Sequence, residues 1–201
     1  MIVSGMLAGL VLYAFVTSIT PGPNNMMLLA SGVNFGFVRS MPHILGISVG
    51  FAVMVILVGA GLSAVFETYP AIHTVLRWIG ATYLIYLAWR IANSSPYERG
   101  EDQTTKRPMS FLAAAAFQWV NPKAWIMALG AITTYLPQQA TVIAVAVLAI
   151  IFAVVNAPCV GVWAAFGVGL RRFLTKPSHF RVFNIAMASL LVLSLYPIVT
   201  H

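Results

Sequence analysis

Charged residues are scarce in this chain of 201 residues: they make up 7% of it, against about 25% in an ordinary soluble domain. Apolar residues make up 60%, and the mean hydropathy is +0.91. This balance excludes an ordinary soluble protein and predicts an integral membrane protein, with the lipid bilayer as its surroundings. No Lys or Arg precedes Arg39, and the first apolar run lacks an A-x-A cleavage site, so we expect residues 1–33 to remain in the mature chain.

Several function classes are excluded by what else is missing. Cys159 is the one cysteine, which leaves no internal disulfide, multi-cysteine metal site or dithiol relay and suggests a packing residue. The absence of a G-x-x-x-x-G-K-[ST] motif and of a long soluble segment excludes an ATP-driven pump within this chain. There is no H-E-x-x-H motif or cluster of His and acidic residues. We expect no enzyme, cofactor or metal. The basic residues never form a continuous patch with interleaved aromatics, so we expect no nucleic-acid partner either.

The apolar runs predict six membrane-spanning helices. They cover about 5–33, 41–66, 70–92, 110–135, 140–168 and 181–199. A polar segment at the midpoint, 93–109, divides this single transmembrane domain (1–201) into halves of about 1–95 and 108–201. If the spans alternate, Arg77 lies on one side and nine basic residues lie on the other: Arg39, Arg90, Arg99, Lys106, Arg107, Arg171, Arg172, Lys176 and Arg181. Because Lys and Arg are retained in cytoplasmic loops, the segment 93–109 is expected in the cytoplasm and both termini in the periplasm or outside.

The first span contains a helix breaker, TPGPNN, at 20–25. Pro21 and Pro23 lack an N–H, so a helix through them loses two backbone hydrogen bonds. Open backbone at membrane depth is tolerated only where protein or a water-filled cavity supplies partners. We therefore predict a substrate cavity lined by Pro21, Gly22, Pro23, Asn24 and Asn25. The alternative is a simple kink whose freed carbonyls bond the nearby hydroxyls of Thr17, Ser18 and Thr20.

The fourth span contains a second breaker, in which Pro122 frees the carbonyl of Gln118 and is flanked by Asn121 and Lys123. The two breaks are 101 residues apart, each in the first span of a three-span half. Because three is odd, the halves must be inverted, and paired breaks in inverted halves indicate a transporter site at the membrane midplane. We therefore add Gln118, Asn121, Pro122 and Lys123 to the candidate site. Similarity between the halves is weak, so the repeat rests on spacing and hydropathy.

Lys123 is the one basic residue well inside a span, where an ammonium costs at least about 2.5–3.5 kcal/mol. Counted from Phe111 along a continuous helix it lies about 18 Å deep, too far for easy snorkelling. We expect it to bind a substrate carboxylate or to take part in proton coupling. In the fifth span, Asn156 and Pro158 predict a third break. Asn156 adds either a polar contact to the cavity or an amide bonded to backbone that Pro158 frees.

None of the spans has an Asp or Glu in its interior. Proton coupling would then have to use Lys123, His43 or the substrate's own ionisable group, and exchange or export without protons stays open. His43, beside Pro42, is more ordinarily interpreted as an interfacial histidine. Glycine pairs at 5 and 9, 32 and 36, and 46 and 50 would serve packing within the chain or a homodimer seam.

The motifs TPGPNN at 20–25, GATYLIYLAW at 80–89 and NPK at 121–123, in this order, resemble the LysE/RhtB amino-acid exporters of bacteria over nearly the whole chain. The resemblance implies a six-helix inner-membrane protein that exports amino acids, driven by the proton motive force. The chain is most similar to the cysteine and O-acetylserine exporter branch. Some members have Asp where this chain has Asn24, which argues against a cationic substrate. We expect a secondary exporter of small neutral amino acids; the alternative is a passive channel or a structural membrane subunit.

Overall fold

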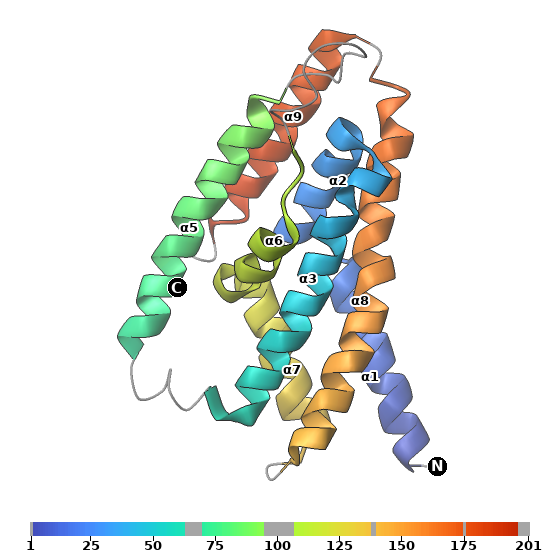
Figure 1. Ribbon diagram of the computed structural model, residues 1–201, viewed down its shortest axis with the longest axis vertical. Helices are drawn as coiled ribbons and strands as arrows, with labels where there is room; N and C mark the ends of the chain where they lie inside the picture. The colour runs from blue at the N-terminus through green and yellow to red at the C-terminus, as the bar shows by residue number, and fades with distance from the viewer. Residues whose placement is uncertain (1, 63–69, 95–106, 138–139, 175, 197–201) are drawn as a thin grey trace.

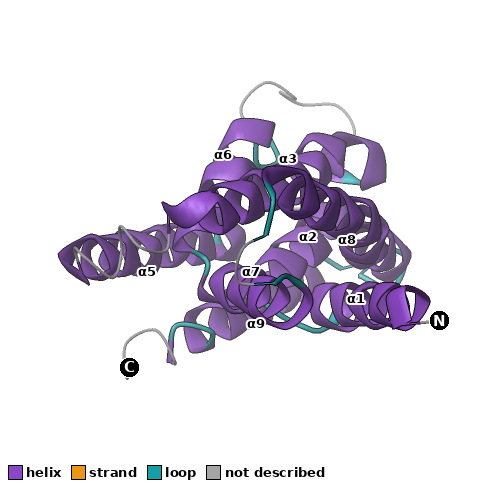
Figure 2. Ribbon diagram, turned by 90° about the horizontal axis from the view of Figure 1, so that it is seen from below, coloured by secondary structure: helices purple, strands orange, loops and turns teal. Residues whose placement is uncertain are grey.

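The computed structural model describes residues 2–62, 70–94, 107–137, 140–174 and 176–196. These residues form helices and short connections without any strand, which confirms the prediction of an all-α chain (Figure 2). The predicted cytoplasmic segment 93–109 lies for the most part outside the described residues, including Arg99 and Lys106.

The helices follow the predicted apolar runs closely. They are α1 (Ile2–Ile19), α2 (Pro23–Phe35), α3 (Phe37–Leu57) with a π-helical turn η1 (Val58–Leu62), α5 (Pro70–Ala92), α6 (Phe111–Phe117) with a 3₁₀ turn η2 (Gln118–Val120), α7 (Pro122–Tyr135), α8 (Val142–Arg171) and α9 (Pro177–Leu193). Local chemistry sets several of these ends. The Ser110 and Thr141 side chains accept hydrogen bonds from first-turn amides of α6 and α8. Gly36, with φ 84°, separates α2 from α3 in a conformation that favours glycine.

Both expected breaks are present. α1 and α2 are bent by 57° across the segment that contains Pro21 and Gly22. The fourth span is divided into α6, η2 and α7, with Pro122 as the first residue of α7. Length and apolar composition qualify two helices as membrane spans, 37–61 and 142–171, and the bent pair makes a third. The six crossings and the inverted halves therefore stay a prediction.

Two expectations about the spans are wrong. α8 runs without interruption through Pro158, because a single proline removes one backbone hydrogen bond and the rest of a long helix persists. The fourth span is not a continuous helix from Phe111, since α6 has only 7 residues and a 3₁₀ turn follows it. The depth of about 18 Å for Lys123, which assumed such a helix, no longer holds.

α8 is the central packing element and contacts α1, α2 and α3, while α5 and α9 pack against each other at one side (Figure 1). Several glycines permit these contacts. A Cβ on Gly46 would meet the backbone of Phe111, and one on Gly50 would meet that of Ala115, so this pair serves packing of α3 on α6. Gly32 faces the backbone of α8 in the same way. These glycines are used within the chain, and Cys159 is buried on α8.

Candidate functional site

The two helix breaks meet, and Lys123 joins them. Its Nζ donates to the carbonyl of Thr20 at 2.6 Å, to the Thr20 hydroxyl at 3.0 Å and to the carbonyl of Pro21 at 3.3 Å. The positive ammonium thus lies at the C-terminal end of α1, where the carbonyl dipoles give a partial negative charge. The second residue of α7 thereby stabilises the open end of a helix about one hundred residues earlier in the chain.

The carbonyls that the two prolines free at the end of α1 both have partners. Thr17 O accepts from the Thr20 hydroxyl at 3.0 Å, as the simple-kink alternative expects. Ile19 O accepts instead from the indole N–H of Trp163 on α8 at 3.0 Å. A local hydroxyl therefore satisfies one of the two freed carbonyls, and a side chain of the neighbouring helix α8 satisfies the other. Sequence reasoning missed Trp163, because an indole in an apolar run gives no signal of its own.

Asn25 satisfies two further carbonyls of the break. Its side-chain nitrogen donates to Ser18 O at 2.9 Å and to Thr20 O at 2.7 Å, and the residue is 2% exposed. Two carbonyl partners fix the orientation of the amide, so its oxygen, Oδ1, points elsewhere. That oxygen is buried and has no hydrogen-bond partner among the described residues. A buried acceptor without a partner is unusual and marks a place where a donor would be stabilised.

The second break is held in a similar manner. The carbonyl of Gln118, freed by Pro122, accepts from the backbone N–H of Asn121 at 3.3 Å in the 3₁₀ turn. The Asn121 side chain caps α7 by accepting from the N–H of Lys123 at 3.1 Å. The indole of Trp125 donates to the carbonyl of Trp119 at 2.9 Å. The helix is therefore interrupted at 118–122 as predicted, and the freed carbonyl of Gln118 finds its hydrogen-bond partner within the same segment.

Two amide side chains also link the breaks. Asn24 donates to Gln118 Oε1 at 2.9 Å, and Gln118 donates back to Asn24 Oδ1 at 3.3 Å. Gln118 is 1% exposed and also donates to the carbonyl of Ala114 at 2.8 Å. This pair connects the first turn of α2 to η2, so the two predicted halves of the site are in direct contact.

Asn156 belongs to the same region. It donates to the hydroxyl of Ser18 at 3.0 Å and accepts from the hydroxyl of Ser48 at 2.9 Å. The alternative in which Asn156 bonds backbone freed by Pro158 is therefore wrong. Its partners lie on α1 and α3, and both serines are buried. Sequence reasoning named Ser18 only as a partner for the kink and did not single out Ser48.

These side chains line a pocket, here called the central cavity. Seven of the predicted site residues line it, and they are Gly22, Asn24, Asn25, Gln118, Asn121, Lys123 and Asn156. The prolines at 21, 23 and 122 do not line it and act through the backbone instead. Apolar side chains, including Ile47, Phe51 and Met127, complete the wall. The central cavity thus brings polar side chains together with apolar ones inside an apolar bundle.

Gly22 is required for space and not for backbone conformation. Its φ of −179° is extended backbone that any residue adopts. A Cβ at this position would lie 2.7 Å from Lys123 Cδ and 3.2 Å from Nζ. A glycine here lets the lysine stem cross the break and reach the end of α1.

His43 does not join this group. It lies on α3 and lines a second cavity with Arg90 and Arg107. Its side chain is 2% exposed, so the interpretation as an interfacial histidine is wrong. Neither ring nitrogen has a hydrogen-bond partner among the described residues. Within the described ranges, no three His, Cys, Asp or Glu side chains are grouped so as to hold a metal ion.

Apolar helices that are interrupted around a pocket with polar side chains are typical of membrane transporters. Comparison with known proteins narrows this class. Residues 15–194 match the LysE type translocator family, so the chain belongs to the LysE family. It is an integral membrane translocator and not an enzyme.

Similar curated proteins include the cysteine/O-acetylserine efflux proteins of Escherichia coli (strain K12), Shigella sonnei (strain Ss046) and Shigella flexneri. Each is 35% identical over 184 residues, which are 90% of this chain and 90% of the relative. No solved structure matches the chain. The family assignment confirms the resemblance drawn from the three sequence motifs.

Proposed function

We propose that this chain exports small neutral amino acids or their derivatives from the cytoplasm, with cysteine, O-acetylserine, homoserine and threonine as candidates. One observation carries the proposal: Lys123 and Asn25 both line the central cavity, and the buried Oδ1 of Asn25 has no hydrogen-bond partner in the described part of the chain. A zwitterion needs a donor for its carboxylate and an acceptor for its ammonium, and these two groups are of the required kinds. The central cavity has no acidic residue in its described lining, which argues against a cationic substrate. The efflux proteins at 35% identity support the same substrate class.

In the proposed cycle, the substrate carboxylate competes with the end of α1 for Lys123. The ammonium has three donors, and all three contact Thr20 or Pro21 in this structure. α2 begins at Pro23 without a side-chain cap, so the amides of its first turn are further donors for the carboxylate. When Lys123 turns to the substrate, the end of α1 loses these bonds. The bend between α1 and α2 can then change and open the cavity to the other side.

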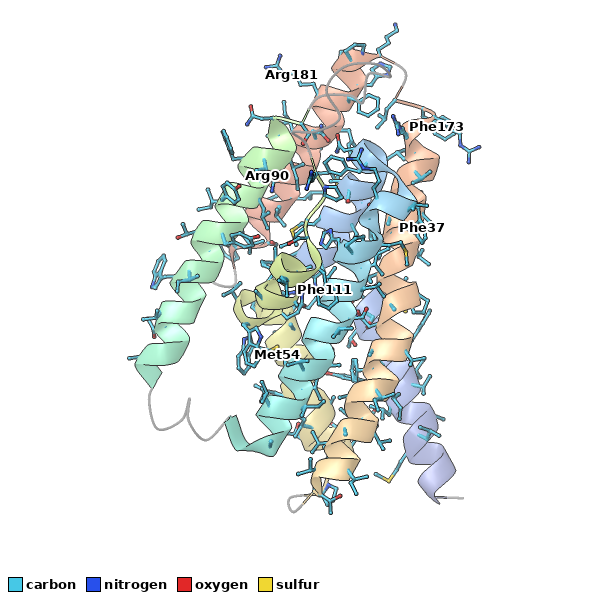
Figure 3. All side chains as sticks on the ribbon, in the orientation of Figure 1. Phe37, Met54, Arg90, Phe111, Phe173 and Arg181 are labelled. Carbon is cyan, nitrogen blue, oxygen red and sulfur yellow. The ribbon has the colours of Figure 1, made fainter. Side chains whose placement is uncertain are left out.

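The proposed topology is six crossings in two inverted halves of an inner-membrane protein. In support, the helices run alternately toward the two ends of the molecule (Figure 1). Basic side chains gather where α5 ends and α9 begins, as Arg90 and Arg181 illustrate (Figure 3). By the retention of Lys and Arg inside, this basic end faces the cytoplasm and both termini lie on the opposite side. Assembly of two copies of this chain into a homodimer stays a prediction.

For energy coupling we propose the proton motive force, with Lys123 and His43 as the candidate groups. Lys123 contacts both halves of the central cavity, and no acidic residue is placed within a described helix. A proton held at Lys123 is exchanged for substrate in this scheme. His43, which is buried in the second cavity, would serve a proton pathway from the cytoplasmic side.

Counterflow in proteoliposomes tests the proposed function. Vesicles are loaded with unlabelled cysteine, O-acetylserine, threonine or leucine, and entry of labelled O-acetylserine is followed. Accumulation above equilibrium that depends on the loaded amino acid establishes a carrier. Its loss in Lys123→Ala, but not in the control Lys176→Ala, places Lys123 in the transport cycle. Flux without saturation or counterflow would establish a channel, and no flux with any amino acid would favour a structural subunit.

A further inference from the structure

The second cavity, which His43 lines, is here called the basic cavity. Its polar lining residues come from several segments, and they are Ser31 and Asn34 on α2, His43 on α3, Arg90 on α5, Ser94 just after α5 and Arg107 in the connection before α6. Apolar residues of α2, of α5 and of the connection before α6 form the remaining wall. None of its residues lines the central cavity, so the two cavities are distinct.

His43 is the buried element of this cavity. With 2% exposure and both ring nitrogens unpartnered among the described residues, it lacks the hydrogen bonds that nearly all buried polar groups make. A buried polar group left without a partner costs about 1–3 kcal/mol. Ligand binding in the basic cavity would supply the missing partner.

The two arginines determine the sign of the charge that the ligand must carry. Arg90 donates to the carbonyl of Arg107 at 3.4 Å, and its guanidinium lies 5.9 Å from the ring centroid of Tyr86. Neither contact neutralises a charge. The described lining of the basic cavity contains no acidic side chain. Two guanidinium groups with planar arrays of donors suit a carboxylate.

The basic cavity lies in line with the central cavity. On α3, His43 is one turn before Ile47 and two turns before Phe51, both of which line the central cavity. On α2, Ser31 and Asn34 are about two and three turns after Asn24 on the same face of the helix. Arg90 lies toward the end of the molecule where the basic side chains gather (Figure 3). A solute moving from that end toward the central cavity therefore meets the basic cavity first.

We propose that the basic cavity binds the carboxylate of the amino acid at the cytoplasmic side, before the substrate reaches Lys123. Arg90 and Arg107 supply the charge, and His43 supplies a buried hydrogen bond. This assignment deepens the proposed export function and rests on it for the identity of the substrate. The site raises the local concentration of substrate at the mouth of the path and orients its carboxylate inward.

Equilibrium binding of labelled O-acetylserine to purified protein in phosphatidylcholine nanodiscs tests the site directly. The Lys123→Ala background removes the ammonium of the central cavity. We expect Arg107→Gln and Arg90→Gln each to raise Kd about tenfold or more, because a charge-assisted hydrogen bond to the carboxylate is lost. His43→Phe also raises Kd, because it removes the ring N–H donor. Arg39→Gln, which removes a charge at the same end but outside the lining, leaves Kd unchanged. Unlabelled O-acetylserine competes, and its carboxamide does not.

Everted membrane vesicles, whose cytoplasmic face is outward, add a readout that a merely structural role would not produce. Arg107→Gln raises KM for uptake about tenfold with kcat retained, whereas Lys123→Ala lowers kcat. Equal binding by Arg107→Gln and Arg39→Gln, or full competition by the carboxamide, would overturn the proposal. Displacement of the amino acid by phosphatidylglycerol in the nanodiscs would assign the cavity to a lipid headgroup instead. If wild type shows no counterflow, the export function fails, while the nanodisc assay still decides whether the cavity binds carboxylates.

Discussion

Trp163→Phe tests whether the break after α1 depends on donors from other helices. The indole N–H donates to Ile19 O at 3.0 Å, and this carbonyl lost its helical partner to Pro23. Phenylalanine keeps an aromatic ring but leaves the carbonyl without a donor inside an apolar bundle. The loss of such a bond is worth about 1–2 kcal/mol. We expect the free energy of unfolding to fall by this amount.

Reversible unfolding in mixed micelles of dodecylmaltoside and SDS, followed by far-UV circular dichroism, measures the difference. Trp89→Phe is the matched control, because the Trp89 side chain is 63% exposed and its indole nitrogen has no partner among the described residues. This control is expected to change the free energy of unfolding by less than about 0.5 kcal/mol. Equal values for Trp163→Phe and Trp89→Phe would refute the idea that the indole stabilises the break.

Three further predictions follow from the site and the packing around it. Gly22→Ala lowers the counterflow rate with little change in stability, because the new Cβ would displace the flexible stem of Lys123; normal counterflow would contradict this. Gly50→Leu strongly destabilises the protein because a Cβ there meets the backbone of Ala115, whereas Gly161→Ala, with neighbours no nearer than 3.9 Å, is neutral; melting temperatures in detergent compare the two. Lys123→Arg keeps a charge but cannot give up its proton. It therefore retains counterflow and loses accumulation driven by an imposed pH gradient, and retained accumulation would exclude Lys123 as the coupling group.

The helix breaks were predictable because the effect of proline is local. Pro21, Pro23 and Pro122 each remove a backbone donor wherever they stand in a helix, and the structure is interrupted at each place. Pro158 shows the limit of that rule. The long helix α8 tolerates one missing bond, so the third predicted break is absent.

The partners across helices were predictable only in part. Spacing in the two halves placed Lys123 and Asn24 in one site, and both contact the opposite break. Trp163 and Ser48 gave no signal, because an indole or a hydroxyl in an apolar run is equally compatible with lipid contact. His43 appeared interfacial from its position beside Pro42, yet three-dimensional packing buries it. Such contacts depend on which helices become neighbours, and periodicity within one helix does not specify that.

The measurement that tests the central claim most directly is the contact between Lys123 and the end of α1 with and without substrate. Solid-state NMR on protein with ¹³C-labelled threonine carbonyls and ¹⁵N-labelled lysine side chains detects the dipolar coupling between Thr20 and Lys123 Nζ, and its loss in Lys123→Ala identifies the signal. The hydrogen bond of 2.6 Å predicts a strong coupling in the absence of substrate. We predict that an amino acid at saturating concentration, chosen by the counterflow assay, weakens or abolishes this coupling, because its carboxylate binds the Lys123 ammonium in place of Thr20. An unchanged coupling at saturation would contradict the proposed role of Lys123 in substrate binding.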